Sequence, residues 1–295
     1  MTRKAEGGND PSEAFAALGD PVRVGIIETL ADRDRTKSQS NGPGLPFSTL
    51  RKRVGVTDSG RFRYHLEQLR GLFVEQTAAG QYHLTAAGGQ VVSAIVRGTY
   101  TDHATVGPTE LDSSCPICSG RPIGKYDNGV LQVSCPNDHQ LFVWALAPNA
   151  ARVERIEPVI DIATREFFHT IEVAHTGVCP DCFSPIDTAI ERVDAPNRAL
   201  RFRAPCGPCG STLDAPAGLC LVSLPELRLL YHHHDRSIYD RFWWQQEFAR
   251  SDPQAAPPDS DPASISFEIG LERELLAVTL SETAGVIDAS LTAMP

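Results

Sequence analysis

The 295-residue sequence has little lysine, since only four of its 27 basic side chains are not arginine. It contains no run of about 18 apolar residues, the length that a membrane-spanning helix needs, so we expect no membrane span. Its first residues show no apolar signal-peptide core, so we expect a cytoplasmic protein whose cysteines stay reduced. It also lacks paired carboxylates, a nucleophile elbow and a Gly-rich phosphate loop, so we expect no enzyme and predict no catalytic residue.

The net charge of −10 is unevenly distributed along the chain. Residues 1–100 carry 13 basic and 10 acidic side chains, whereas residues 101–295 carry 14 basic and 27 acidic ones. This asymmetry predicts that the N-terminal third meets a polyanion and that the remainder does not. The acidic, lysine-poor and arginine-bearing composition also resembles that of proteins from extreme halophiles.

Seven of the eight cysteines have the spacing of zinc knuckles, in which the two thiolates of Cys-x-x-Cys converge on one tetrahedral ion. Two such knuckles form a complete four-thiolate shell, made of Cys179, Cys182, Cys206 and Cys209. A closed shell leaves no position for water or substrate, so we expect structural zinc. Disulfides and a redox-active Cys-x-x-Cys are the alternatives, but matched pairs of Pro-containing knuckles favour zinc over both. Cys220 lies in an apolar run and is predicted to be a core residue.

A second zinc shell is predicted upstream, although one half of it is irregular. Cys115 and Cys118 form a regular knuckle, but Asp138 stands where a cysteine would complete the knuckle that begins at Cys135. The fourth ligand is therefore His139 or Asp138. We favour His139, because imidazole is a better zinc ligand beside thiolates than a carboxylate is. The sequence thus predicts two structural zinc ions.

The N-terminal third predicts a compact set of helices with a short hairpin. Asp20 is positioned to cap the second helix and Ser48 the third. The predicted elements are two helices within residues 12–32, a helix over 48–53, a helix over 57–70, strands near 73–77 and 81–84, and a helix over 86–96. Apolar residues at helical spacing predict the buried stripe of the fourth helix: Phe62, Leu66, Leu69 and Phe73. This order of elements is that of a winged helix-turn-helix domain.

The helix over residues 57–70 is the predicted recognition helix, since residues 51–70 hold six basic and two acidic side chains. In helix-turn-helix docking this helix enters the major groove while the preceding helix crosses the DNA backbone. For any single arginine a solvated helix face is the better interpretation, but the cluster favours DNA. The predicted DNA-binding residues are Arg51, Lys52, Arg53, Ser59, Gly60, Arg61, Arg63, Tyr64, His65 and Gln68. For His65, packing at the helix edge is the alternative to contact with a phosphate. The turn at residues 77–80, between the two predicted strands, is the wing of such a domain. It carries no basic residue, so we expect it to contribute little to the affinity for DNA.

Two knuckle-containing units about 65 residues apart form an internal repeat in the rest of the chain. We predict an α+β protein in which an N-terminal winged helix-turn-helix domain precedes two zinc-ribbon-like modules, connecting helices and a C-terminal β-hairpin. The predicted domains are 12–98 (winged helix), 111–150 (first zinc-ribbon-like module), 151–175 (connecting helix), 176–222 (second module), 223–250 (aromatic helical segment) and 264–290 (β-hairpin), with linkers at 101–110 and 251–263. In the aromatic segment, Trp243, Trp244 and Phe248 are predicted to be core rather than a ligand cage.

Two segments carry a family resemblance that covers residues 12–98. Leu18–Arg23 followed by Ile26–Leu30 resembles the opening of ArsR-like winged helix transcription regulators, and Arg63–Leu69 is similar to their recognition-helix motif. The remainder is similar to the zinc-ribbon extension of haloarchaeal members. The resemblance implies a regulator that binds double-stranded DNA as a homodimer. Residues 48–54 contain no cysteine, so the arsenic-type sensing site is not carried over and the effector, small molecule or protein, stays unassigned.

The alternative function is a zinc-ribbon module that binds protein or RNA without DNA readout. RNA-binding ribbons place basic residues between their knuckles. The segment between Cys182 and Cys206 is weakly basic, with arginines at 192, 198, 201 and 203 against acidic residues at 187, 191 and 194. This alternative therefore stays open beside the DNA-binding hypothesis.

Overall fold

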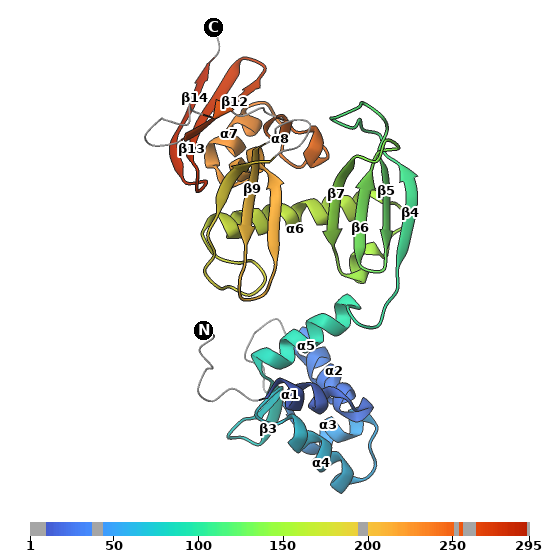
Figure 1. The fold of residues 1–295 in the computed structure, drawn as a ribbon. Helices are drawn as coiled ribbons and strands as arrows, with labels where there is room; N and C mark the ends of the chain where they lie inside the picture. Colours follow the sequence, from blue (N-terminus) through green and yellow to red (C-terminus); the bar gives the residue numbers. More distant parts are fainter. Residues whose placement is uncertain (1–9, 37–43, 194–199, 251–253, 256–263, 294–295) are drawn as a thin grey trace. The chain divides into compact units, whose positions relative to one another are not determined.

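The computed structural model describes residues 10–36, 44–193, 200–250, 254–255 and 264–293, which form an α+β protein with four small antiparallel sheets (Figure 1). The chain divides into two compact units, Met1–Asp102 and His103–Pro295. The linker predicted at 251–263 lies mostly outside the described residues. No helix in the described part of the chain is both long enough and apolar enough to cross a bilayer.

The N-terminal unit is built from five helices and three short strands in its described residues. They are α1 (Pro11–Leu18), α2 (Pro21–Thr36), β1 (Leu45–Pro46), α3 (Phe47–Val54), α4 (Ser59–Leu69), β2 (Val74–Gln76), β3 (Gln81–Leu84) and α5 (Ala86–Arg97). The Asp20 carboxylate accepts the Val22 N–H at 2.8 Å and caps α2, as predicted. Ser48 does not cap α3, because the helix begins one residue earlier, behind Pro46. The strand β1 was not predicted, and it pairs with β3 to give the sheet order β1-β3-β2.

The core of this unit lies between α2 and α4. Phe62, Leu66 and Leu69 of α4 are buried, as their spacing predicted, and they share one apolar cluster with Ile26 and Ile27 of α2. Each large apolar side chain removed from water contributes about 1.5–3 kcal/mol to the free energy of unfolding. The cluster is confined to the N-terminal unit, so this unit has a core of its own.

The C-terminal unit holds three of the four sheets. Its strands are β4 (Thr105–Glu110), β5 (Ile123–Asp127), β6 (Val130–Ser134), β7 (Gln140–Ala145), β8 (Ala189–Arg192), β9 (Leu200–Pro205), β10 (Thr212–Pro216), β11 (Gln254–Ala255), β12 (Ser264–Leu271), β13 (Glu274–Ser281) and β14 (Val286–Ala293). Its helices are α6 (Glu157–His175), α7 (Pro225–His233) and α8 (Glu247–Arg250), with the 3₁₀ turns η1 (Pro148–Ala151), η2 (Ala217–Ser223) and η3 (Trp243–Gln245). The sheet orders are β4-β5-β6-β7, β10-β9-β8 and β11-β12-β13-β14.

One sequence prediction about this unit is wrong, and another is incomplete. The linker predicted at residues 101–110 contains β4, whose Val106 pairs with Tyr126 of β5. The strand was not predicted because it contains Gly107 and Pro108, which are uncommon inside strands. The pairing of β4 with β5 is irregular between Val106 and Thr109, where these two residues lie. The C-terminal hairpin predicted at residues 264–290 is present as the antiparallel pair β12 and β13, but it is part of a four-stranded sheet, because β14 pairs along β13 and β11 pairs with β12.

The 19-residue helix α6 organises the core of the C-terminal unit. It runs from the β4–β7 sheet to the β8–β10 sheet (Figure 1). One face of α6 is buried, with Ile160 and Phe167 toward its start and middle and Ile171 near its end. All five ranges predicted downstream of residue 110 contribute to the single apolar cluster around this helix. Cys220 belongs to the same cluster, as predicted, and so do Trp243, Trp244 and Phe248.

A hydrogen-bonded tyrosine joins α7 to α8. The buried Tyr231 hydroxyl donates to the Glu247 carboxylate at 2.6 Å, and the same carboxylate accepts from Arg236 at 2.9 Å. Replacing Tyr231 with phenylalanine should lower the free energy of unfolding of this unit by about 1–2 kcal/mol, because a charged acceptor loses one donor. The matched variant Tyr239→Phe should change it by less than about 0.5 kcal/mol, since the Tyr239 hydroxyl has no hydrogen-bond partner among the described residues. Urea unfolding followed by tryptophan fluorescence measures both, and equal losses in the two variants would contradict this assignment.

Candidate metal sites and the basic helix

Cys115, Cys118, Cys135 and His139 form one group whose ligand atoms all lie within 4.8 Å of one another. The His139 Nδ1 lies 3.2 Å from the Cys135 Sγ and 3.6 Å from the Cys115 Sγ. The Cys118 Sγ lies 3.6 Å from the Cys135 Sγ. The first pair lies in the loop before β5, and the second lies between β6 and β7. The donors are therefore three sulfurs and one imidazole nitrogen, a set that could hold a metal ion.

The backbone of the knuckles explains why His139 and not Asp138 completes this group. In the regular knuckle the Cys115 N–H donates to the carbonyl of Gly120 at 2.8 Å, and Ser119 has a φ of +61°. In the irregular half the Cys135 N–H donates to the carbonyl of His139 at 3.0 Å, and the left-handed residue is Asp138, with a φ of +60°. The turn is thus one residue shorter, Asp138 occupies its strained position, and the longer side chain of His139 reaches back to the thiols.

The second group consists of Cys179, Cys182, Cys206 and Cys209, and its four sulfurs also lie within 4.8 Å of one another. The Cys179 Sγ lies 3.7 Å from the Cys209 Sγ, and the Cys182 Sγ lies 3.5 Å from the Cys206 Sγ. These separations are far longer than a disulfide bond of about 2.05 Å, and all eight cysteines of the chain are free thiols. The regular knuckle turn recurs here, with the Cys179 N–H donating to Ser184 and the Cys206 N–H donating to Ser211, both at 2.8 Å.

Neighbouring polar groups favour the thiolate form of two of these cysteines. The side-chain amide of Asn137 donates to the Cys118 Sγ at 3.3 Å and, with other hydrogen bonds, lowers the pKa of Cys118 to about 6. Hydrogen bonds from the side chain and backbone of Ser184 lower the pKa of Cys182 to about 6. Thiolate is the form that binds metal. The sequence analysis missed Asn137 and Ser184, although both lie within two residues of a ligand.

The exposed face of α4 carries most of the predicted DNA-binding side chains. Those that are exposed on α3 and α4 are Lys52, Arg53, Ser59, Gly60, Arg61, Arg63, Tyr64 and Gln68. The Asp58 carboxylate caps α4 by accepting the Arg61 N–H at 2.8 Å, which leaves the Arg61 side chain on the outside. The Arg63 guanidinium lies 5.2 Å from the centre of the Phe47 ring, a cation–π contact that orients it on the surface. Tyr64 is 60% exposed.

Two predicted DNA-binding residues have other surroundings. His65 is buried, with its Nδ1 3.4 Å from the Asp20 carboxylate, so it joins α4 to the start of α2 rather than facing outward. Arg51 is half-buried, and its Nη1 donates to the carbonyls of Val56 and Thr57, which fixes the turn between α3 and α4. Helical spacing could not reveal either role, because both depend on partners outside the helix concerned.

Two family models match the chain, one in each compact unit. A model described as a domain of unknown function (DUF7347) matches residues 11–95, and another described as a domain of unknown function (DUF7351) matches residues 112–286. No curated protein and no solved structure matches the chain. The second model spans both metal-ligand groups and more than half of the sequence. The chain therefore belongs to the family of the domain of unknown function DUF7351.

Proposed function

We propose that the protein is a sequence-specific, DNA-binding transcription regulator whose N-terminal unit is an ArsR-like winged helix-turn-helix domain. The observation that carries this proposal is the face of α4, where Arg61, Arg63 and Tyr64 are all exposed. The order α1-α2-α3-α4 followed by the β2–β3 hairpin and α5 supports it, because α4 then takes the position of the recognition helix.

The charges around this face support DNA as the partner. Arg70 is neutralised by a bidentate pair with Glu67, at 2.8 and 2.9 Å. Lys52, Arg53 and Arg61 make no ion pair with another described residue, so they are available to phosphates. Arginine and tyrosine on an exposed helix can also donate to base edges in the major groove.

We propose zinc as the metal of both ligand groups. In a tetrahedral site with Zn–S distances of about 2.3 Å, neighbouring thiolates lie about 3.8 Å apart, and a thiolate and an imidazole nitrogen about 3.6 Å apart. The sulfurs of the second group are 3.5 and 3.7 Å apart, and the sulfur-to-nitrogen distances in the first are 3.2 and 3.6 Å. Each group supplies four protein ligands, so the zinc is structural, and the free thiols fit a cytoplasmic protein.

We also propose that the regulator is a homodimer joined through its N-terminal unit. Phe15 of α1, Val96 of α5 and the nearby Tyr100 are 72%, 43% and 84% exposed. Apolar side chains of this size on helices next to the DNA-binding elements are suited to pairing with a second copy.

The triple variant Arg61→Ala, Arg63→Ala, Tyr64→Ala should lose sequence-specific DNA binding. If Arg63 contacts a guanine edge, the single variant Arg63→Ala should lose about 1–3 kcal/mol at cognate sites only. Lys52→Ala should instead weaken binding evenly across sequences and reduce the salt slope, because a lysine contacts phosphate. Fluorescence anisotropy on fragments recovered by genome-wide mapping of the wild-type protein measures these effects.

The double variant Glu67→Gln, Arg70→Gln is the matched control for the triple variant. It removes an ion pair whose two charges cancel, so the net charge of the α4 face is unchanged. It should therefore bind DNA like the wild type. A folded triple variant that binds as well as the wild type would contradict the proposal and favour a protein- or RNA-binding module.

The structure offers less support to that alternative. Arg201 donates to Asp214 at 2.6 Å, and Arg203 lies 3.3 Å from Glu191. Arginines that are already paired with carboxylates attract a nucleic acid backbone weakly. Arg198 lies outside the described residues.

A further inference from the structure

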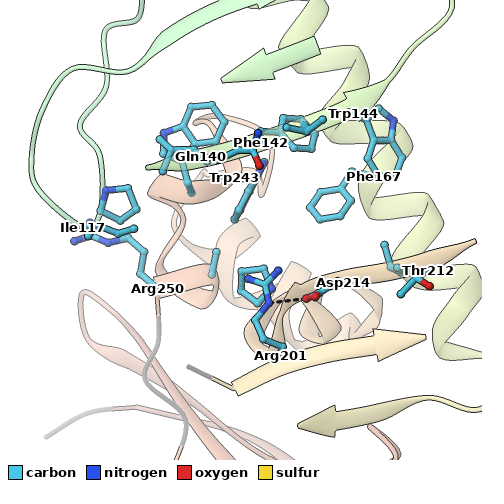
Figure 2. A pocket seen from close by; sticks show the side chains of 17 residues that line it. Ile117, Gln140, Phe142, Trp144, Phe167, Arg201, Thr212, Asp214, Trp243 and Arg250 are labelled. Atoms are coloured by element: carbon cyan, nitrogen blue, oxygen red, sulfur yellow. Dashed lines mark hydrogen bonds and ion pairs between the residues drawn. The ribbon is translucent and has the colours of Figure 1, made fainter. Parts of the chain in front are cut away.

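The C-terminal unit contains a cavity of about 600 Å³ that the DNA-binding proposal does not use. It lies between the β4–β7 and β8–β10 sheets, with Phe142 of β7 on one side and Thr212 of β10 on the other (Figure 2). Ile117, within the first knuckle, also contributes to its wall. Pockets that bind small molecules have volumes of roughly 300–1,000 Å³ and mostly apolar walls with a few polar groups. The size of this cavity suits a molecule of one or two rings.

Aromatic rings form much of the wall. They are Phe142, Trp144, Phe167, Trp243 and Trp244. Phe142 and Trp144 are stacked, with ring centres 6.1 Å apart, and Phe167 lies 5.1 Å from Trp144 and 5.8 Å from Trp243. These rings come from β7, α6 and η3, so they are held by three different elements. A rigid aromatic wall of this kind favours a planar apolar group, which it contacts at low entropic cost.

The polar groups of the cavity favour an anion. Arg201 and Asp214 neutralise each other across 2.6 Å, as the dashed line in Figure 2 shows. Arg250 also lines the cavity, and its side chain makes no hydrogen bond or ion pair with another described residue. Among the described cationic side chains that line the cavity, the exposed Arg250 is thus the one without a carboxylate partner.

We infer that this cavity binds a small planar aromatic carboxylate, with its ring against the aromatic wall and its carboxylate at Arg250. A guanidinium recognises a carboxylate through paired, charge-assisted hydrogen bonds, which a neutral or cationic ligand cannot reproduce. The ligand contacts residues of the β4–β7 sheet and of the β8–β10 sheet, and so it connects these two sheets. This inference goes beyond the proposed function, and its test needs no DNA, so the two can fail separately.

Three probes of one shape test the charge preference on the full-length, metal-loaded protein. They are 3-phenylpropanoate, its neutral amide and the cation 3-phenylpropylamine, at one salt concentration. Isothermal titration calorimetry should give an affinity for the acid at least tenfold above that for the amide, and weaker binding still for the amine. The chain has three tryptophans, and all three line the cavity, so the acid should also change the intrinsic tryptophan fluorescence.

Three variants test whether the probes bind in this cavity and at Arg250. Arg250→Gln should bring the affinities for acid and amide within about twofold of each other, because only the acid uses the guanidinium. Arg241→Gln, an exposed arginine outside this cavity, should keep the preference of the wild type. Val143→Phe places a ring in the cavity at a half-exposed position and should weaken all probes at least tenfold. The inference is overturned if no probe binds at millimolar concentration, if acid and amide bind equally to the wild type, or if Val143→Phe leaves binding unchanged.

Discussion

Gly88→Ala should destabilise the N-terminal unit by about 2–3 kcal/mol, the cost of forcing an extra methyl group into a packed interior. A Cβ atom at Gly88 would lie 2.2 Å from the carbonyl oxygen of Phe73. That oxygen cannot move away freely, because it accepts the Thr85 N–H at 3.0 Å at the start of α5. The clash therefore separates α5 from the loop after α4.

Hydrogen exchange of the full-length protein measures this loss in each unit separately. The slowest amides of α4 should exchange roughly 30- to 150-fold faster in Gly88→Ala, while those of α6 stay unchanged because that helix has a separate core. Gly89→Ala is the matched control one residue along α5. No atom lies within 4 Å of a Cβ at Gly89, so alanine should stabilise the helix by about 0.5–1 kcal/mol. Equal effects at the two positions would contradict the packing described for Gly88.

Cys206→Ser should lower the metal content from two ions per chain to one and destabilise the C-terminal unit by several kcal/mol. Structural zinc contributes about 10–16 kcal/mol to the folding of small zinc-dependent peptides, so the loss of one ligand has a large effect. Cys206 is buried in the turn between β9 and β10, where its backbone N–H donates to the carbonyl of Ser211 at 2.8 Å. Native mass spectrometry measures the metal, and urea unfolding measures the stability.

Cys220→Ala is the control for the loss of a thiol. Cys220 is buried and belongs to neither ligand group, so this variant should keep both ions and lose only about 1 kcal/mol from a small cavity. The hydrogen exchange rates of the α4 amides should be unchanged in both Cys206→Ser and Cys220→Ala. Two ions retained by Cys206→Ser, or none in reduced wild-type protein, would contradict the metal sites.

Local patterns in the sequence predicted most helices of the fold but not the ends of the sheets. The spacing of Phe62, Leu66 and Leu69 identified α4, because these apolar side chains lie on one face of a helix and that face is the buried one. The strand β1 escaped prediction because it is two residues long and exists only through its pairing with β3. The strand β14 escaped because most of its residues are exposed, so it lacks the alternation that marks a half-buried strand.

The grouping of the candidate metal ligands was predictable because knuckle spacing fixes their geometry locally. The sequence left His139 and Asp138 as alternatives, and the choice depends on a backbone turn that no spacing rule contains. The surroundings of His65 and the cavity at Trp243 were not predictable for a different reason. Each depends on residues far away in the chain, Asp20 for the histidine and Phe142 for the tryptophan.

The position of α6 limits how this protein can be cut into fragments for experiments. Its buried face contacts the first knuckle-bearing sheet near Ile160 and the region of the second near Ala174. A fragment that ends at residue 150 would lose the helix, and one that begins at 176 would expose the residues that the helix covers. Either would present a large apolar surface and aggregate. The useful place to divide the gene is between codons 102 and 103, where one compact unit ends and the next begins.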